Sequence, residues 1–67
     1  MNKFAERLAE ELKSRGISKN KAAKMIGVSH PSICDWTNNK IQPNAESIYM
    51  TCKALDVSAD YLLGLVD

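Results

Sequence analysis

Apolar side chains recur along this chain every three or four positions, which is the period of an α-helix rather than that of a β-strand. The N-terminal segment shows this clearly, because charged residues surround a single apolar stripe. The members of the stripe are Phe4, Ala5, Leu8, Ala9 and Leu12. Asn2 is an expected N-cap and Gly16 an expected C-terminal stop, so the pattern predicts a first helix from about Lys3 to Arg15.

One local pattern then occurs three times: an aliphatic residue, a serine, and another apolar residue four positions after the serine. The three copies are Ile17-Ser18 with Ala22, Val28-Ser29 with Ile33, and Val57-Ser58 with Leu62. Each predicts a helix start, because the serine hydroxyl can accept a hydrogen bond from a first-turn amide while the apolar pair packs together. A fourth start is expected at Asn44, since Pro43 discourages helix at Gln42.

The expected stops agree with these starts. Gly27 lies between the second and third helices, and Asn38 and Asn39 follow the third. The fourth helix ends near Asp56, and a short fifth helix stops at Gly64. The apolar face predicted for the fourth helix consists of Ala45, Ile48, Cys52 and Leu55; the fifth helix spans about Ala59 to Leu63. No stretch alternates as a strand would, so the predicted fold is all-α, a compact bundle of five short helices in one domain over residues 1–67.

The second and third helices, Ser18–Ile26 and His30–Thr37, are separated only by residues 27–29. A tight turn containing glycine forces two short helices to cross steeply, which predicts a helix-turn-helix unit over about residues 18–37. Ile33 and Trp36 form the one apolar stripe of the third helix, so Trp36 is expected in the core rather than stacked on a base. The residues left to face outward are His30, Pro31, Ser32, Cys34, Asp35 and Thr37.

The composition bears on three points: metal binding, membrane insertion and the state of the two cysteines. The 67 residues include one histidine and two cysteines, Cys34 and Cys52, which cannot supply the four Cys and His ligands of a structural zinc site, so no metal or cofactor is expected. No apolar run is long enough to span a membrane, and a cytoplasmic domain with reduced thiols is expected. Cys52 lies on an apolar face and is expected to be an inert core thiol. Cys34 is expected to be unreactive beside the charge of Asp35, although a redox switch is the alternative.

The net charge of +1 hides an uneven distribution. It is the sum of −1 over residues 1–12 (two bases, three acids), +5 over residues 13–40 (six bases, one acid) and −3 over residues 41–67 (one base, four acids). A basic middle segment can present a positive face to a polyanion. The alternative is a solvated helix surface, and charge alone does not decide between the two.

Four segments together resemble the lambda-repressor-like helix-turn-helix family of phage repressors, Cro proteins and related bacterial regulators. They are residues 17–29 (ISKNKAAKMIGVS), 30–36 (HPSICDW), 38–44 (NNKIQPN) and 54–64 (ALDVSADYLLG). The resemblance covers nearly the whole chain, and its specificity comes from the order and spacing of these pieces rather than from any one of them.

The resemblance implies that the third helix enters the major groove of DNA, while the start of the second helix and the loop after the third contact the backbone. The residues expected to contact base edges are His30, Pro31, Ser32 and Asp35. Those expected to contact phosphates are Lys19, Asn38, Asn39, Lys40 and Gln42. Lys19 stands where the family usually has glutamine, and Pro31 and Asp35 replace more usual polar or basic residues, which leaves the target sequence open.

Each base-contact residue also has a plainer interpretation. His30 can be an exposed first-turn residue without a role, Pro31 a favourable helix-start residue, and Ser32 part of a cap. Asp35 can accept from cytosine N4 or can pair with a nearby lysine at the surface. At the C-terminus, the apolar side chains exceed what so small a core can absorb, which predicts a dimer contact at Leu62, Leu63, Leu65 and Val66.

These features predict a sequence-specific DNA-binding transcriptional regulator, a repressor of phage or plasmid and bacterial type, that binds an operator inverted repeat in double-stranded DNA as a homodimer. The alternative is a protein-interaction module or antitoxin-like protein that keeps the fold with weak or no DNA binding. No enzyme or small-molecule substrate is expected, because there is no Gly-rich phosphate loop and His30 has no nucleophile partner. The length fits both a complete Cro-sized protein and the N-terminal domain of a longer repressor.

Overall fold

The computed structural model describes residues 2–67 and contains five α-helices and, within those residues, no strand. The helices are α1 (Phe4–Arg15), α2 (Lys19–Ile26), α3 (His30–Thr37), α4 (Ala45–Leu55) and α5 (Ala59–Leu63). The all-α prediction is confirmed, and the predicted helix boundaries agree with the observed ones to within one residue.

Four helices begin with the predicted side-chain caps. Ser18, Ser29, Asn44 and Ser58 each accept a hydrogen bond from the backbone amide three residues later, over 3.1, 3.3, 2.8 and 3.1 Å. The first helix differs slightly, because Lys3 occupies the cap position without a side-chain bond. Asn2 supplies the missing acceptor from one residue further out, since its Oδ1 accepts from the Phe4 amide at 3.0 Å.

The turn between α2 and α3 depends on Gly27, which has φ +90°. An L-residue rarely adopts this left-handed conformation, and a Cβ placed at Gly27 would lie 3.3 Å from Cε of Met50 on α4. Two non-glycine residues also have positive φ: Asp56, which ends α4, and Asn39, in the loop after α3. Both are residue types that tolerate this region.

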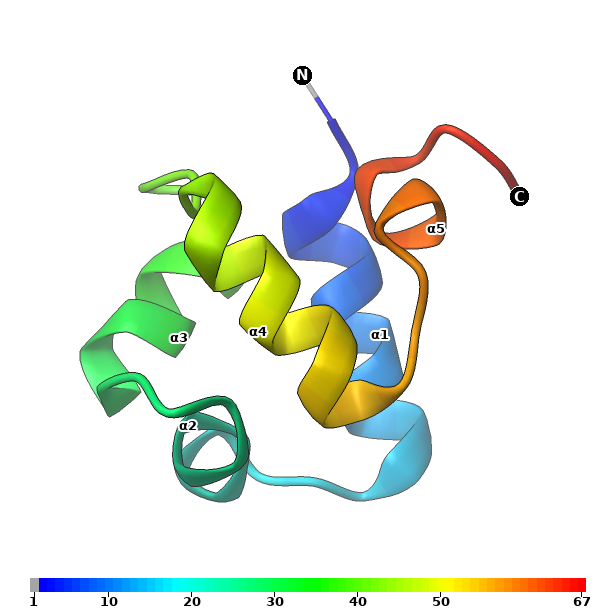
Figure 1. The fold of residues 1–67 in the computed structure, drawn as a ribbon. Helices are drawn as coiled ribbons and strands as arrows, with labels where there is room; N and C mark the ends of the chain where they lie inside the picture. The colour runs from blue at the N-terminus through cyan, green and yellow to red at the C-terminus, as the bar shows by residue number, and fades with distance from the viewer. Residues whose placement is uncertain (1) are drawn as a thin grey trace.

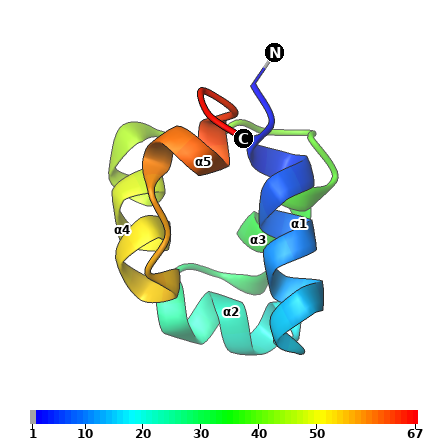
Figure 2. The same cartoon turned by 90° about the vertical axis from the view of Figure 1, so that its right-hand side faces the viewer.

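The five helices form a closed ring around the core. Helix α1 packs against α3 and α5, α2 packs against α3 and α4, and α4 packs against α5. Figure 2 shows α4, α5, α1 and α2 around this ring, with α3 behind them, and Figure 1 shows α3 at one edge of the molecule. Within residues 2–67, no helix is both long and apolar enough to cross a membrane.

Every helix contributes apolar side chains to one core. Its buried hydrophobic members are Phe4, Leu8, Leu12, Ala22, Ala23, Ile26, Ile33, Trp36, Leu55 and Leu62. The rings of Phe4 and Trp36 meet edge-on, with centroids 5.9 Å apart and planes at 82°. Trp36 is 6% exposed, so its predicted place in the core is confirmed.

The apolar face predicted for α4 was partly wrong. Leu55 is buried, and Ile48 and Cys52 are half-buried and pack against the core as predicted, but Ala45 is exposed at the first turn. Thr51, which the prediction left out, is fully buried. The hydroxyl of Thr51 donates to the Ser47 carbonyl oxygen at 2.8 Å, which removes most of the cost of burying a polar group. Burial raises the pKa of the Cys52 thiol above its ordinary value.

The predicted dimer contact also needs a correction. Leu62 is 0% exposed and belongs to the core of its own chain, so it is not available to a second chain. Leu63 is half-buried, whereas Leu65 and Val66 are 72% and 50% exposed. Leu62 is the buried residue of α5, and Tyr61 and Leu63 pack partly against the core on either side of it. Leu65 and Val66 follow the end of the helix and lie at the surface.

Arg7 ties the C-terminal segment to α1. Its Nη1 donates to the carbonyl oxygens of Tyr61 and Val66, at 2.7 and 2.6 Å, and its guanidinium lies 4.6 Å from the Tyr61 ring centroid. The Leu65 amide donates to the Asp60 carbonyl oxygen at 2.8 Å. These contacts hold the residues after α5 in a defined path, with Leu65 and Val66 at the surface.

Candidate nucleic-acid interface

Helix α3 exposes one side because its other side is fixed in the core. Ile33 and Trp36 are its buried residues, and they pack among the apolar side chains of the core. With 3.6 residues per turn, His30, Pro31, Cys34 and Asp35 fall on the arc opposite these two anchors. His30 and Pro31 are exposed, while Cys34 and Asp35 are half-buried. Of the predicted base-contact residues, three therefore share the outward arc of α3.

The fourth, Ser32, lies at the flank of that arc and takes part in the helix cap. Its amide donates to Ser29 Oγ, and the two hydroxyl oxygens lie 2.9 Å apart. The cap was one of the two roles that its position predicted. A base contact by Ser32 stays a prediction, and it is compatible with the cap, because a serine hydroxyl can accept one hydrogen bond and donate another.

Asp35 has no basic partner in the described part of the chain. The single ion pair found among residues 2–67 joins Arg15 to Glu11, so the surface pairing with a lysine that was one interpretation of Asp35 is not observed. The backbone of Asp35 does have partners, because its carbonyl oxygen accepts from the amides of Lys40 (2.9 Å) and Ile41 (3.4 Å). These bonds fold the following loop back onto the end of α3.

That loop contains four of the predicted phosphate-contact residues, all exposed: Asn38, Asn39, Lys40 and Gln42. Gln42 Nε2 donates to Asn39 Oδ1 at 2.9 Å, and Asn2 Nδ2 donates to Gln42 Oε1 at 3.1 Å. The structure thus links the loop to the start of α1 through Asn2. The sequence predicts only a cap at Asn2, because a contact across 40 positions leaves no local signal.

The fifth predicted phosphate contact, Lys19, is the first residue of α2 and is exposed. The N-terminus of a helix carries unpaired amides and a partial positive charge, which favour an anion. The Ser18 hydroxyl accepts a hydrogen bond from one of these amides, that of Lys21. Lys19 therefore adds a full positive charge at a helix end that is already suited to a phosphate.

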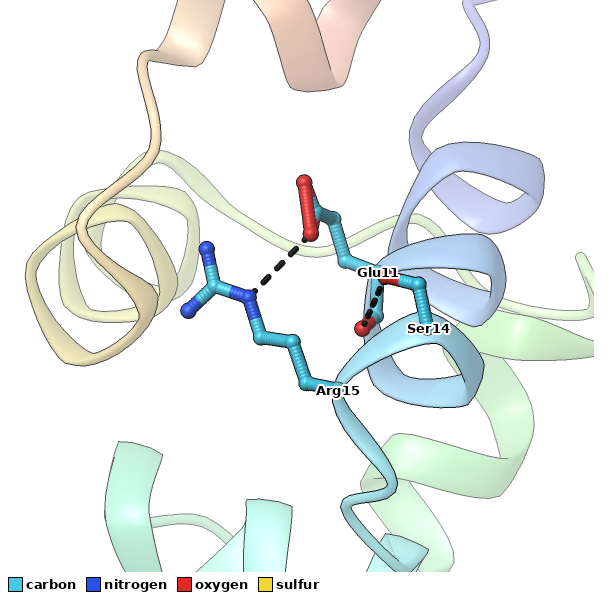
Figure 3. Close-up of polar contacts among 3 residues, drawn as sticks. All are labelled: Glu11, Ser14 and Arg15. Atoms are coloured by element: carbon cyan, nitrogen blue, oxygen red, sulfur yellow. Dashed lines mark hydrogen bonds and ion pairs between the residues drawn. The ribbon is translucent and has the colours of Figure 1, made fainter.

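The positive charge of the middle segment comes mainly from lysines. Figure 3 shows Arg15 extending back towards Glu11, with Nε 3.2 Å from Oε2, so part of its charge is compensated. Ser14 donates to the Glu11 carbonyl oxygen beside this pair. The remaining basic residues of this segment are exposed and come from α1, α2 and the loop after α3: Lys13, Lys19, Lys21, Lys24 and Lys40.

Helices α2 and α3, joined by the short turn at residues 27–29, define a helix-turn-helix protein. Comparison with known sequences agrees with this assignment. A family described as helix-turn-helix matches residues 8–62. The match covers α2, the turn and α3, together with α4 and most of α1 and α5. The chain belongs to this family, as its resemblance to lambda-repressor-like proteins predicted.

A curated relative is Repressor protein C2 of Salmonella phage P22, which is 38% identical over 60 residues. The alignment covers 90% of this chain but 28% of the phage protein, so the chain spans little more than a quarter of that relative.

The fold of this chain is also similar to those of solved DNA-binding proteins and regulators. The crystal structure of the P22 c2 repressor in complex with synthetic operator 9T, in the presence of Tl⁺, has a TM-score of 0.85 and 35% identity, covering 94% of this chain and 96% of that one. The NMR structure of the DNA-binding domain of the same repressor has a TM-score of 0.84 and 37% identity, covering 94% and 86%. A transcriptional regulator from Listeria innocua, 22% identical, has a TM-score of 0.87 over 100% of this chain and 63% of its own, which shows the shared fold.

Proposed function

We propose that this protein is a sequence-specific DNA-binding repressor that inserts α3 into the major groove of an operator inverted repeat. Residues 1–67 act as one DNA-binding domain, with the helix-turn-helix at about residues 18–37. The observation that carries the proposal is the similarity to the operator-bound P22 repressor, which extends over 94% of the chain. The similar proteins are described as repressors and a transcriptional regulator, and catalysis has no part in the proposal.

The exposed arc of α3 supports a direct reading of bases. His30 donates to guanine, Pro31 contacts a thymine methyl group, and Asp35 accepts from cytosine N4. Ser32 contacts a base at the flank of the helix. The absence of an ion-pair partner for Asp35 among residues 2–67 supports this role, because a carboxylate that faces DNA must gain a donor to offset its repulsion by phosphates.

Two groups of residues, one on either side of α3, contact the sugar-phosphate backbone of the DNA. Lys19 and the N-terminus of α2 hold one phosphate, and the loop after α3 holds others through Asn38, Asn39, Lys40 and Gln42. Such contacts fix the register of the protein on the duplex without reading its sequence.

A homodimer places two copies of α3 in successive major grooves, about 34 Å apart along the duplex. The exposed side chains of Leu65 and Val66, with the half-buried Leu63, are the proposed dimer contact. Leu62 has no part in it.

The salt dependence of binding tests the phosphate contacts. We expect Lys19→Ala and Lys40→Ala each to reduce the slope of log K against log salt by about 0.9, since one fewer counterion is released. Lys53→Ala is the matched control, because it removes the same charge from α4, in the acidic part of the chain. Binding to random duplex DNA, measured by fluorescence anisotropy at several salt concentrations, gives the slopes.

Undetectable binding to random duplex at low salt would contradict the repressor proposal and favour a protein-interaction module with the same fold. Equal slopes for all three variants would contradict the assignment of Lys19 and Lys40.

The role of Asp35 is tested by site selection. Selection of bound sequences from random duplexes should return an inverted repeat with wild-type protein, and Asp35→Ala should relax the preference at one base pair in each half-site. The expected loss of discrimination is about 1 kcal/mol, the lower end of the range of about 1–3 kcal/mol for a bidentate pair, because Asp35 would make a single hydrogen bond to the base. If the selected sites of the two proteins are the same, Asp35 is a surface residue.

A further inference from the structure

The outward arc of α3 contains the one histidine of the chain and one of its two cysteines, placed one helical turn apart. His30 Nε2 lies 3.7 Å from Cys34 Sγ, near the surface. The pair stands by itself, because residues 2–67 contain no group of three or more His, Cys, Asp and Glu side chains that could hold a metal ion. The DNA-contact proposal uses His30 but leaves Cys34 without a role.

The separation of these two atoms matches that of a metal chelate. In tetrahedral zinc sites the Zn–S distance is about 2.3 Å and the Zn–N distance about 2.0–2.1 Å, which places the sulfur and nitrogen about 3.6 Å apart. The observed 3.7 Å differs from this by less than the tolerance of about 0.2 Å used to judge a metal site.

The helix holds both ligands in place before any metal arrives. Ser29 caps the turn that contains His30, and Ile33 and Trp36 fix α3 in the core on either side of Cys34. Pro31 restricts the backbone next to His30. Binding then requires only small side-chain rotations, which lowers its entropic cost.

We propose that His30 Nε2 and Cys34 Sγ form a two-ligand site for a divalent transition-metal ion of the zinc class. Thiolate and imidazole ligands favour such ions over Mg²⁺ and Ca²⁺, which prefer oxygen. Water fills the other coordination positions. Cys34 releases its thiol proton as the S–metal bond forms, so the site gains one net positive charge.

If His30 contacts a base as the proposed repressor function requires, a metal ion on His30 competes with DNA. The nitrogen that binds the metal is the one at the tip of His30, so the same atom cannot also contact a base. Metal binding and the His30 base contact therefore exclude each other, and a metal ion weakens operator binding. By linkage, operator DNA weakens metal binding by the same factor.

Titration of the DNA-free chain with Co²⁺ tests the site, because a thiolate ligand gives a charge-transfer band in the near ultraviolet. We expect a band that saturates at one Co²⁺ per chain and disappears when Zn²⁺ is added. Cys34→Ser should abolish the band, and His30→Ala should weaken Co²⁺ binding at least about tenfold, since even outer-shell partners of metals contribute that much. Cys52→Ser is the matched control and should keep both the band and the affinity.

No thiolate band at millimolar Co²⁺, or a band that is lost in Cys52→Ser and kept in Cys34→Ser, would overturn the proposal. Thermal unfolding of each variant without metal shows whether it is folded. Because this titration contains no DNA, its failure leaves the repressor proposal unaffected.

The consequence is tested with a duplex selected by the metal-free protein. Zn²⁺ should weaken wild-type binding to that duplex and leave the binding of Cys34→Ser unchanged, each compared with its own affinity in EDTA. Equal weakening of both proteins by Zn²⁺ would contradict the competition at His30. Failure of DNA binding in EDTA would count against the repressor proposal and not against the metal site.

Discussion

Thr51 is the one fully buried polar side chain among the residues that the structure describes. It lies at the centre of the inner face of α4, and its hydroxyl donates to the Ser47 carbonyl oxygen of the preceding turn. A hydrophobic pattern overlooks such a residue, because threonine counts as polar in any apolar stripe. Helical geometry resolves the conflict, since a threonine hydroxyl can satisfy itself on the carbonyl four residues earlier.

Replacing Thr51 separates packing from hydrogen bonding. Thr51→Val keeps the shape but removes the donor, and we expect it to lower the free energy of unfolding by about 0.5–1.5 kcal/mol, the net contribution of one hydrogen bond. Thr51→Ala also removes a methyl group from a filled core, so its loss should exceed that of Thr51→Val. Urea denaturation followed by circular dichroism measures both. A Thr51→Val protein as stable as the wild type would show that the hydroxyl bond contributes nothing net.

Helix starts were predictable because their signals are local. Ser18, Ser29, Asn44 and Ser58 each meet an amide three residues away, and no other part of the molecule is needed to form that bond. The inner face of α4 was less predictable, because the packing of several helices decides which residues of a helix face the core. Ala45 shows the limit, since it continues the apolar spacing but lies beyond the region that the other helices cover.

The Ser29 cap stabilises the first turn of α3, and that turn carries two residues of the candidate interface, His30 and Pro31. Ser29→Ala and Ser58→Ala remove equivalent caps from α3 and α5, and each should lower the free energy of unfolding by about 1 kcal/mol. Only Ser29→Ala frays the turn that contains His30 and Pro31, so it alone should also weaken DNA binding at a temperature where both variants are folded. Chemical denaturation and anisotropy on the same samples compare the two. Equal DNA affinity for the two variants would mean that the first turn of α3 does not contact DNA.

Contacts between distant parts of the chain were beyond sequence reasoning. Asn2 meets Gln42, and Arg7 meets Val66, through hydrogen bonds that exist because the helices close into a ring. No local pattern encodes the closure. The candidate interface was more accessible, because resemblance located its residues on α2, α3 and the following loop, and the structure finds those residues at the surface except for the half-buried Ser32 and Asp35. Whether they contact DNA remains a prediction.

Arg7 provides a test of how the ring is held closed at the C-terminus. Arg7→Lys keeps the charge but replaces a planar group that bonds two carbonyl oxygens and stacks on Tyr61 with a compact ammonium. We expect a loss of about 1–2 kcal/mol in the free energy of unfolding, since hydrogen bonds to charged groups contribute about 1.5–3 kcal/mol when buried and less when exposed. Arg15→Lys is the matched control on the same helix. Its surface pair with Glu11 should contribute at most about 0.5 kcal/mol.

The effect of Arg7→Lys should reach the proposed dimer contact. Once the bond to the Val66 carbonyl is weakened, residues 65–67 lose their defined path, and the amide of Leu65, bonded to Asp60, should exchange its hydrogen faster. Ordering this segment in a dimer then costs more entropy, so self-association should weaken in sedimentation equilibrium. Unchanged association together with faster exchange at Leu65 would place the dimer contact elsewhere on the molecule, whereas unchanged exchange would show that Arg7 does not hold the C-terminal segment.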